Sequence, residues 1–282
     1  MADNFEQLRD WVGRREVRSD IVTSWPVTAL TATVDDMQVS AENSKPLPPG
    51  WHWMFFLEAK PPSELGVDGH PKRGGFLPPV PLPRRMWAGG RIEFLRPLAI
   101  GDSVTRESEI VSVEPKSGRT GTLVFVTVRH TVTGSAGVAI VEEQDIVYRE
   151  AAKKGDPLPP GKQAPAGAQW TRRVMPDTVM LFRYSSLTFN GHRIHYDKDY
   201  AINEEYYPGL VVHGPLQATL LLDLCRRNAP SSITKFEYRA QYPLFAGSAF
   251  TVNGNFDAAA SKADVWTANE AGNYAIRGTA SF

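Results

Sequence analysis

The segment FNGHRIHYDKDYA, residues 189–201, places several polar and titratable side chains at a spacing that suits proton-transfer chemistry. It contains two imidazoles, His192 and His195, preceded by the amide of Asn190. A neutral imidazole with a pKa of about 6.5 suits proton transfer at neutral pH. An amide both donates and accepts hydrogen bonds, so it can hold a water molecule. We therefore take His195 as a candidate general acid–base and Asn190 as the group that orients its water.

The same segment has two other interpretations. A metal site would use His192 and His195 with Asp197 and His213, but the spacing is not that of a helical HExxH motif. We therefore expect no bound metal. Alternatively, the segment is a polar loop in which the side chain of Asp197 caps the helix that follows. That capping role accounts for Asp197, but it does not explain two imidazoles between apolar flanks.

Proton transfer to and from a carbonyl compound also requires a group that stabilises negative charge, and the segment VVHGPLQ can supply it. Gly214 stands at the start of the stretch GPLQATLLLDLCRRN, residues 214–228, which we predict to be a helix. The first backbone N–H groups of a helix have no partner within it and can receive an oxyanion. Gly214 is therefore a candidate backbone donor, unless it only turns the chain into the helix.

The elements that position these residues are a buried helix and an antiparallel sheet, each expected twice. Residues 214–228 are apolar almost all round, which predicts a helix wrapped by a sheet. The counterpart in the first half is GWHWMFFLEAK, residues 50–60, and strand-like segments follow both stretches. The turn PLAIGD, residues 97–102, resembles PLFAGS, residues 243–248, about half the chain away. These features predict an α+β fold of the double hot-dog type.

We expect three parts along the chain. Residues 1–150 form an N-terminal hot-dog domain, residues 151–167 a linker rich in Pro, Gly and Lys, and residues 168–282 a C-terminal hot-dog domain that carries the candidate site. The first domain also contains a Pro/Gly-rich stretch, residues 61–90. A loop of that length in a compact domain is usually functional or mobile.

Composition excludes several classes of function. Among 282 residues, 31 are Lys or Arg and 31 are Asp or Glu, so a nucleic-acid partner is not expected. The single cysteine, Cys225, rules out an internal disulfide and a cysteine-rich metal site. No apolar run approaches the roughly 20 residues that span a bilayer, so we expect no membrane partner and a cytoplasmic protein.

The motifs together resemble the MaoC-like, (R)-specific enoyl-CoA hydratase family. The matching residues are Asn190 to Asp197, then Tyr200-Ala201, then Val212-His213-Gly214. Further similarity, through FRYSSLTFNGHRIHYD and LPRRMWAGGRIEF, is to 3-methylfumaryl-CoA (mesaconyl-CoA) and itaconyl-CoA hydratase-like proteins and to acyl-thioester dehydratases. The resemblance implies a catalytic second half and a degenerate first half. Asn190 departs from the family's aspartate, so His195 must carry more of the base chemistry, or another carboxylate must enter the site.

The resemblance implies addition or removal of water across the double bond of an enoyl-CoA thioester, without a cofactor. For a branched dicarboxylic substrate we expect arginines at the acyl terminus, with Arg84, Arg85 and Arg193 as candidates and His213 nearby. We also expect a homodimer, because hot-dog sheets have edges to pair. The alternatives are an acyl-CoA thioesterase and a non-catalytic acyl-CoA-binding protein, since one fold hosts several functions.

Overall fold

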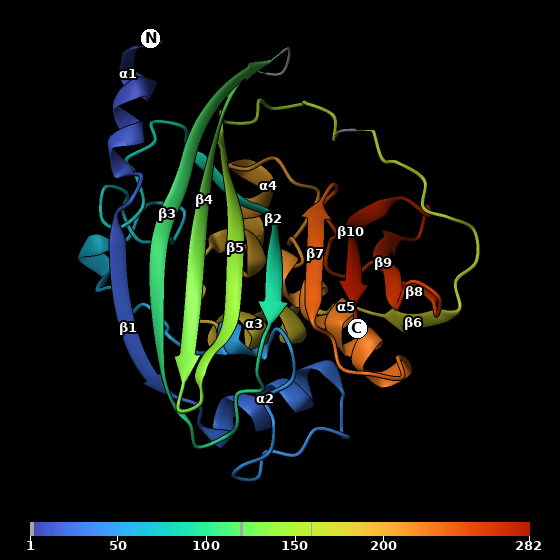
Figure 1. Cartoon of the computed structure of the whole chain (residues 1–282). Coiled ribbons are helices and arrows are strands. Elements are labelled where there is room, and N and C mark those ends of the chain that lie inside the picture. The colour runs from blue at the N-terminus through green and yellow to red at the C-terminus, as the bar shows by residue number, and fades with distance from the viewer. Residues whose placement is uncertain (1–2, 119–120, 159) are drawn as a thin grey trace.

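The structure, a computed structural model, describes residues 3–118, 121–158 and 160–282. Its strands form one antiparallel ten-stranded sheet in the order β1-β3-β4-β5-β2-β7-β10-β9-β8-β6 (Figure 1). The strands are β1 Arg15–Ile21, β2 Arg84–Phe94, β3 Ser103–Gly118, β4 Gly121–Gly134, β5 Gly137–Arg149, β6 Trp170–Val174, β7 Lys235–Ala240, β8 Phe250–Asp257, β9 Lys262–Asn269 and β10 Tyr274–Ser281. Residue 159 of the predicted linker lies outside the described residues.

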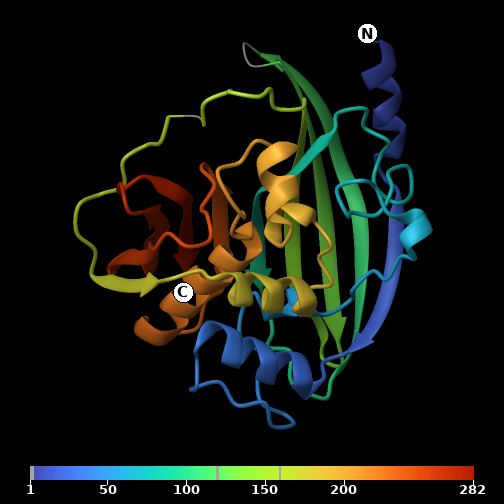
Figure 2. The ribbon, with the colours of Figure 1, turned by 180° about the vertical axis from the view of Figure 1, so that it is seen from behind.

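The strand order is the same in both halves of the chain. Read outward from the centre, the first half runs β2-β5-β4-β3-β1 and the second runs β7-β10-β9-β8-β6. The two PL-x-x-G turns occupy equivalent places before β3 and β8, and Gly101 and Gly247 both have positive φ, 101° and 85°. The connection between β5 and β6 passes outside the sheet to its far edge (Figure 2). This repeated order confirms the predicted double hot-dog fold.

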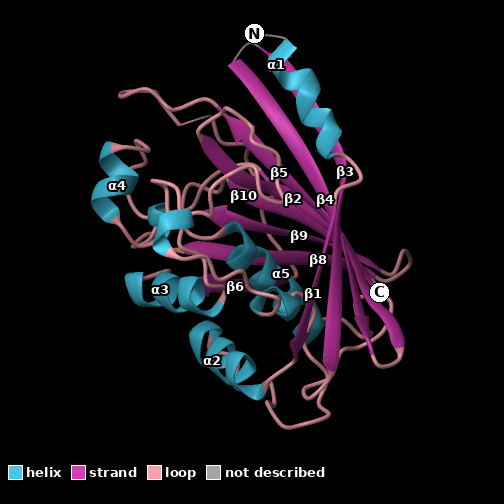
Figure 3. Cartoon of the chain, turned by 90° about the vertical axis from the view of Figure 1, so that its left-hand side faces the viewer, coloured by secondary structure: helices cyan, strands magenta, loops and turns pink. Residues whose placement is uncertain are grey.

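The main helices lie together on one face of the sheet (Figure 3). The helices are α1 Asp3–Glu6, α2 Ser24–Val34, α3 Thr178–Leu187, α4 Lys198–Asn203 and α5 Gly214–Asn228, with 3-10 helices η1 Gln7–Trp11, η2 Trp51–Met54, η3 Pro62–Glu64 and η4 Arg193–His195. None of the helices in the described part of the chain is long and apolar enough to cross a membrane.

Helix α5 is the buried helix predicted from the sequence. Every residue from Leu216 to Cys225 is buried, and the helix packs against strands β6 to β10. Two of its polar side chains are anchored inside the core: Asp223 accepts a hydrogen bond from Nε1 of Trp51 at 3.2 Å, and Gln217 accepts one from the hydroxyl of Thr267 at 2.9 Å. An apolar helix of this kind has no stable place except under a sheet, so its burial fixes the position of its N-terminus at Gly214.

The predicted first-half helix over residues 50–60 is wrong. Only Trp51–Met54 is helical, as a single 3-10 turn, and the longest α-helix of this half is α2, residues 24–34. Phe55 is extended and Phe56 has a φ of 59°, so the turn does not continue. Bulky aromatic residues crowd this segment, and Pro61-Pro62 closes it, which are both unfavourable for a helix.

The predicted loop over residues 61–90 is shorter than expected. Strand β2 begins at Arg84, so the insertion covers residues 61–83 and both Arg84 and Arg85 lie on a strand. In the ladder with β5, Arg85 stands opposite Tyr148. The sheet therefore fixes the backbone of the two arginines, which a mobile loop would not do.

Strands β2 and β7 join the two halves of the sheet, and their close approach requires a glycine. A Cβ atom at Gly89 would lie 2.4 Å from the carbonyl oxygen of Tyr238 in β7. We expect Gly89→Ala to lower the free energy of unfolding by about 2 kcal/mol, because the backbone must shift to accept the methyl group. Chemical denaturation measures this change. Gly209→Ala, where a Cβ would meet nothing within 4 Å, is the control; equal stability of the two variants would contradict the prediction.

Candidate active site

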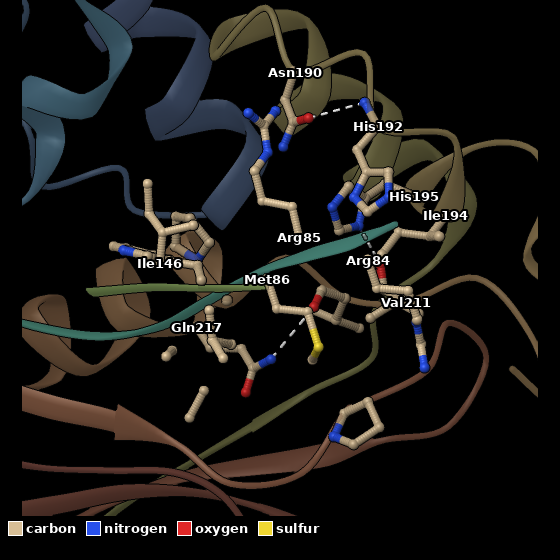
Figure 4. Close-up of a pocket in the computed structure, with 18 of the residues that line it drawn as sticks. Arg84, Arg85, Met86, Ile146, Asn190, His192, Ile194, His195, Val211 and Gln217 are labelled. Carbon is tan, nitrogen blue, oxygen red and sulfur yellow. Dashed lines mark hydrogen bonds between the residues drawn. The ribbon is translucent and has the colours of Figure 1, made fainter. Parts of the chain in front are cut away.

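Five of the seven candidate residues, drawn from both halves of the chain, meet at one cavity of about 490 Å³ (Figure 4). Its wall includes Asn190, His192 and His195 from the quoted segment, and Gly214 from the start of α5. Strand β2 contributes a second wall that carries the two arginines. The imidazole of His195 and the N-terminus of α5 therefore face the same space.

His195 has one ring nitrogen fixed and the other open. Nδ1 lies 2.7 Å from the carbonyl oxygen of Val211, which can only accept, so Nδ1 carries the proton. In the neutral ring Nε2 then holds the lone pair of a base. Burial lowers the pKa of His195 to about 4, and the hydrogen bond to Val211 only partly opposes this. The ring is therefore neutral at pH 7 and able to accept a proton.

His213 lies beneath His195 rather than in the cavity wall. The two rings are stacked, with centroids 3.7 Å apart, and His213 is fully buried. Its Nε2 lies 2.9 Å from the hydroxyl of Ser185 in α3. Burial holds its pKa well below the usual value. His213 is therefore a packing support for the His195 ring, and the substrate-binding role expected for it has no geometric support.

The Asn190 side chain is held by a hydrogen bond within its own segment. Its Oδ1 accepts the backbone N–H of His192 at 3.0 Å, so the side chain folds into a short turn (Figure 4). The amide nitrogen remains for the cavity. Asn190 can therefore donate a hydrogen bond to a water oxygen there, but it cannot remove a proton.

The N-terminus of α5 offers backbone donors to the same cavity. Gly214 begins this helix of 15 residues, and Pro215, which has no N–H, occupies its first turn. The first bond inside the helix is made by Gln217, which donates to the carbonyl of His213. A Cβ on Gly214 would only touch Trp87 at 3.4 Å, so glycine keeps the approach to this backbone N–H open.

The three candidate arginines have different environments. Arg84 is buried, forms an ion pair with Glu205 at 2.6 Å and lies over the ring of Tyr207. Arg193 is paired with Asp197 at 2.7 Å and is not part of the cavity wall. Arg85 lines the cavity, and no carboxylate among the described residues forms an ion pair with it. Its side chain extends towards Asn190 in Figure 4.

The structure does not assemble the metal ligands considered from the sequence. Asp197 caps α4, accepting the backbone N–H of Tyr200 at 3.0 Å, as the capping interpretation predicted. Its other oxygen is held by Arg193. Of the four residues in that set, Asp197 thus faces away from the three histidines.

His70 is one of the cavity residues that the sequence did not reveal. It belongs to the insertion over residues 61–83, and its ring lies 4.1 Å from the ring of His192. The length of the insertion was the only available signal, because the contact joins residues far apart in the sequence. Nothing local marks His70 as part of the site.

A double hot-dog fold with a buried imidazole facing the N-terminus of its central helix defines a hydratase or dehydratase of the MaoC-like class. Solved structures agree on the fold. A MaoC-like dehydratase is 15% identical with a TM-score of 0.70, covering 95% of this chain and 97% of that one. A Mycobacterium tuberculosis protein described as a double hotdog is 14% identical with a TM-score of 0.57, covering 98% and 97%.

The chain belongs to the hydroxyacyl-thioester dehydratase type 2 family, whose model matches residues 50–246. The mesaconyl-C(4)-CoA hydratase of Chloroflexus aurantiacus is 49% identical over 238 residues, which cover 83% of this chain and 84% of that protein. The resemblance to MaoC-like hydratases is thereby confirmed, and the protein is a hydro-lyase.

Proposed function

We propose that the protein adds water to, or removes it from, the double bond of a dicarboxylic enoyl-CoA, such as mesaconyl-C4-CoA (3-methylfumaryl-CoA) or itaconyl-CoA. The observation that carries the proposal is the shared cavity, in which an open imidazole nitrogen, an amide donor and a helix N-terminus come together. The similarity to a mesaconyl-C(4)-CoA hydratase supports the choice of acyl group.

In the hydration direction each group has a defined task. The amide of Asn190 holds the water, and Nε2 of His195 accepts a proton as the water oxygen bonds to Cβ. The double-bond electrons move to Cα and onto the thioester oxygen, where the N–H of Gly214 stabilises the negative charge. The imidazolium of His195 then returns its proton to Cα. One imidazole completes both transfers on one face, and the chemistry uses no metal or other cofactor.

Arg85 gives the site its preference for a second carboxylate. In a fumaryl-type thioester the free carboxylate is attached at Cβ, the carbon that receives water. A guanidinium beside Asn190 places that carbon next to the bound water, and its two N–H groups match a carboxylate. We do not assign this role to Arg84, because its Nε is paired with Glu205 at 2.6 Å.

A substrate panel tests this proposal. The protein is mixed with mesaconyl-C4-CoA, itaconyl-CoA and crotonyl-CoA, and the loss of enoyl absorbance is followed together with release of free thiol. We expect hydration of a dicarboxylic ester and no thiol release. Thiol release without hydration would indicate a thioesterase, and tight binding without turnover would indicate a binding protein; either result contradicts the proposal.

We also propose that the chain works in the cytoplasm as a homodimer. Strands β1 and β6 form the two outer edges of the sheet and are the available places for strand pairing. Sedimentation or light scattering of the purified protein measures the oligomeric state.

A further inference from the structure

The insertion is fixed to the active-site segment by a backbone contact. At Gly69, where φ is 86°, a Cβ would lie 1.9 Å from the carbonyl oxygen of Gly191. The backbone N–H of Arg193 donates to the carbonyl of Asp68 at 2.9 Å, and its guanidinium donates to the carbonyl of Val67 at 3.1 Å. No side chain fits between the two segments at Gly69, so residues 67–70 are built onto the site.

This contact brings a carboxylate–imidazole pair to the cavity. Nδ1 of His70 lies 2.9 Å from one oxygen of Asp68, and the His70 backbone N–H donates to the other at 3.0 Å. The two side chains are 20% and 18% exposed, so the pair is largely withdrawn from solvent. Because the Nδ1–H group of His70 donates to Asp68, Nε2 of His70 carries the lone pair. This nitrogen has no hydrogen-bond partner among the described residues.

Burial, together with the charge of Arg85, keeps this imidazole neutral. Burial and the charge of Arg85 lower the pKa of His70 to about 4, and the Asp68 carboxylate only partly opposes them. Despite partial burial, the hydrogen bonds and charge of His70 hold the pKa of Asp68 below its usual value. The other groups that face His70 are Arg73 and the ring of His192, which is tilted by 39° from the His70 ring. His70 is therefore an acceptor at neutral pH.

The proposed hydration calls for a second hydrogen-bond acceptor. A water molecule has two O–H groups, and an acceptor for each of them holds it best for attack. Nε2 of His195 accepts one, whereas Oδ1 of Asn190 already accepts the backbone N–H of His192. A neutral amide oxygen is also a weaker acceptor than the carboxylate that it replaces.

We propose that His70, held by Asp68, accepts the second O–H of the attacking water and is thus a catalytic residue of the hydration. This inference rests on the proposed function. The O–H bond directed at His195 breaks and its proton later reaches Cα, whereas the O–H directed at His70 is retained in the product hydroxyl group. Asp68 is a positioning residue, because it sets which nitrogen of His70 faces the water. Asp68 of the insertion thus contributes a carboxylate to the site, and it acts through the imidazole of His70.

The test compares variants of the insertion in the hydration assay. We expect His70→Ala to lower kcat about 100-fold with a nearly unchanged KM, because the acceptor acts on the water rather than on substrate binding. Asp68→Asn should lower kcat less, and His70→Gln, whose amide oxygen accepts, should keep part of the activity. Added imidazole should restore turnover to His70→Ala. Ser63→Ala, at an exposed position of the insertion outside the cavity wall, is the control.

A second variant leaves the His70 ring untouched. Gly69→Ala must move the insertion away from Gly191, so it should also lower kcat, whereas Gly75→Ala, where a Cβ meets nothing within 4 Å, should not. Full kcat in His70→Ala would overturn the inference while leaving the hydratase assignment intact. Absence of turnover by the unmodified protein on the whole panel would instead reject the proposed function.

Metal dependence is the competing outcome. Ligand atoms of Asp68, His70 and His192 lie within 4.8 Å of one another. If a chelator abolished turnover and added Zn²⁺ restored it, the three side chains would be assigned to a cation and the water-holding role of His70 would be overturned. Turnover that is unaffected by the chelator supports that role.

Discussion

His195→Gln is expected to lower kcat for hydration about 10³-fold, because glutamine fills a similar volume but transfers no proton. The effect should appear in kcat rather than in KM, since the lost group acts on the water and on Cα. The control is Lys198→Gln, at an exposed position three residues further on that lies outside the cavity wall. Steady-state kinetics of the two variants measure the difference, and full activity of His195→Gln would reject the mechanism.

The same imidazole makes a prediction about pH. The active form is neutral, and burial lowers the pKa of His195 to about 4. We therefore expect kcat/KM for hydration to stay level as the pH falls through the ordinary imidazole range of about 6.5 and to decline only towards the lower value. A decline centred on the ordinary value would show that the ring is solvated and would contradict its burial.

The free energy of unfolding should respond to acid at a higher pH than the one at which activity declines. The unfolded chain binds a proton at His195 near the ordinary pKa of about 6.5, whereas the folded chain does so only near the lowered pKa of about 4. Between these values unfolding takes up a proton, so the free energy of unfolding falls as the pH falls through this window. Chemical denaturation at several pH values should show this slope, and it should be smaller in His195→Gln.

Arg85→Gln is expected to lower kcat/KM for mesaconyl-C4-CoA about 100-fold, which corresponds to roughly 3 kcal/mol for a lost charged hydrogen bond. The same change should have little effect on crotonyl-CoA, which has no second carboxylate. The ratio of the two kcat/KM values is therefore the measurement. It does not depend on the amount of active protein, so it separates substrate selectivity from a loss of folding.

Arg84→Gln is the matched comparison, because the two arginines are neighbours on β2. It removes one member of the buried pair with Glu205, so it should lower the free energy of unfolding by roughly 3 kcal/mol. The ratio of dicarboxylic to monocarboxylic activity should stay unchanged. A change in that ratio in Arg84→Gln, with none in Arg85→Gln, would exchange the roles assigned to them.

The parts of the fold that could be predicted from the sequence are those with a strong local pattern. Helix α5 is apolar on nearly all sides over residues 214–228, and no other position in a folded chain suits such a segment. The cap at Asp197 and the repeated PL-x-x-G turns are also local signals. In contrast, the aromatic segment after Gly50 has the apolar content of a helix without its conformation.

Helix α2 left a weaker signal in the sequence. Residues 24–34 are rich in threonine and valine, which favour strands, although Pro26 in the first turn is typical of a helix start. The preference of these side chains for strands was overridden by packing, since Val27, Leu30 and Val34 are buried in the core.

The features of the site that could not be predicted depend on contacts between distant parts of the chain. Arg84 and Arg85 have the same side chain on adjacent positions, and only the location of Glu205 separates their roles. Likewise, the approach of His70 to His192 depends on a glycine-to-glycine contact across more than a hundred residues. Neither relation has a period or a spacing that a single sequence reveals.

The junction of β2 with β7 bears on how such an enzyme can specialise. Two identical hot-dog chains joined along this edge would be related by a two-fold axis and would have to build two equivalent reaction centres. Covalent fusion removes that obligation, so each copy is free to diverge. In the proposed mechanism the first copy supplies the insertion and the guanidinium that hold the water and the substrate, and the second copy supplies the imidazole that transfers the proton and the helix terminus. The loss of symmetry between the two copies thus allows each of them to take a different role.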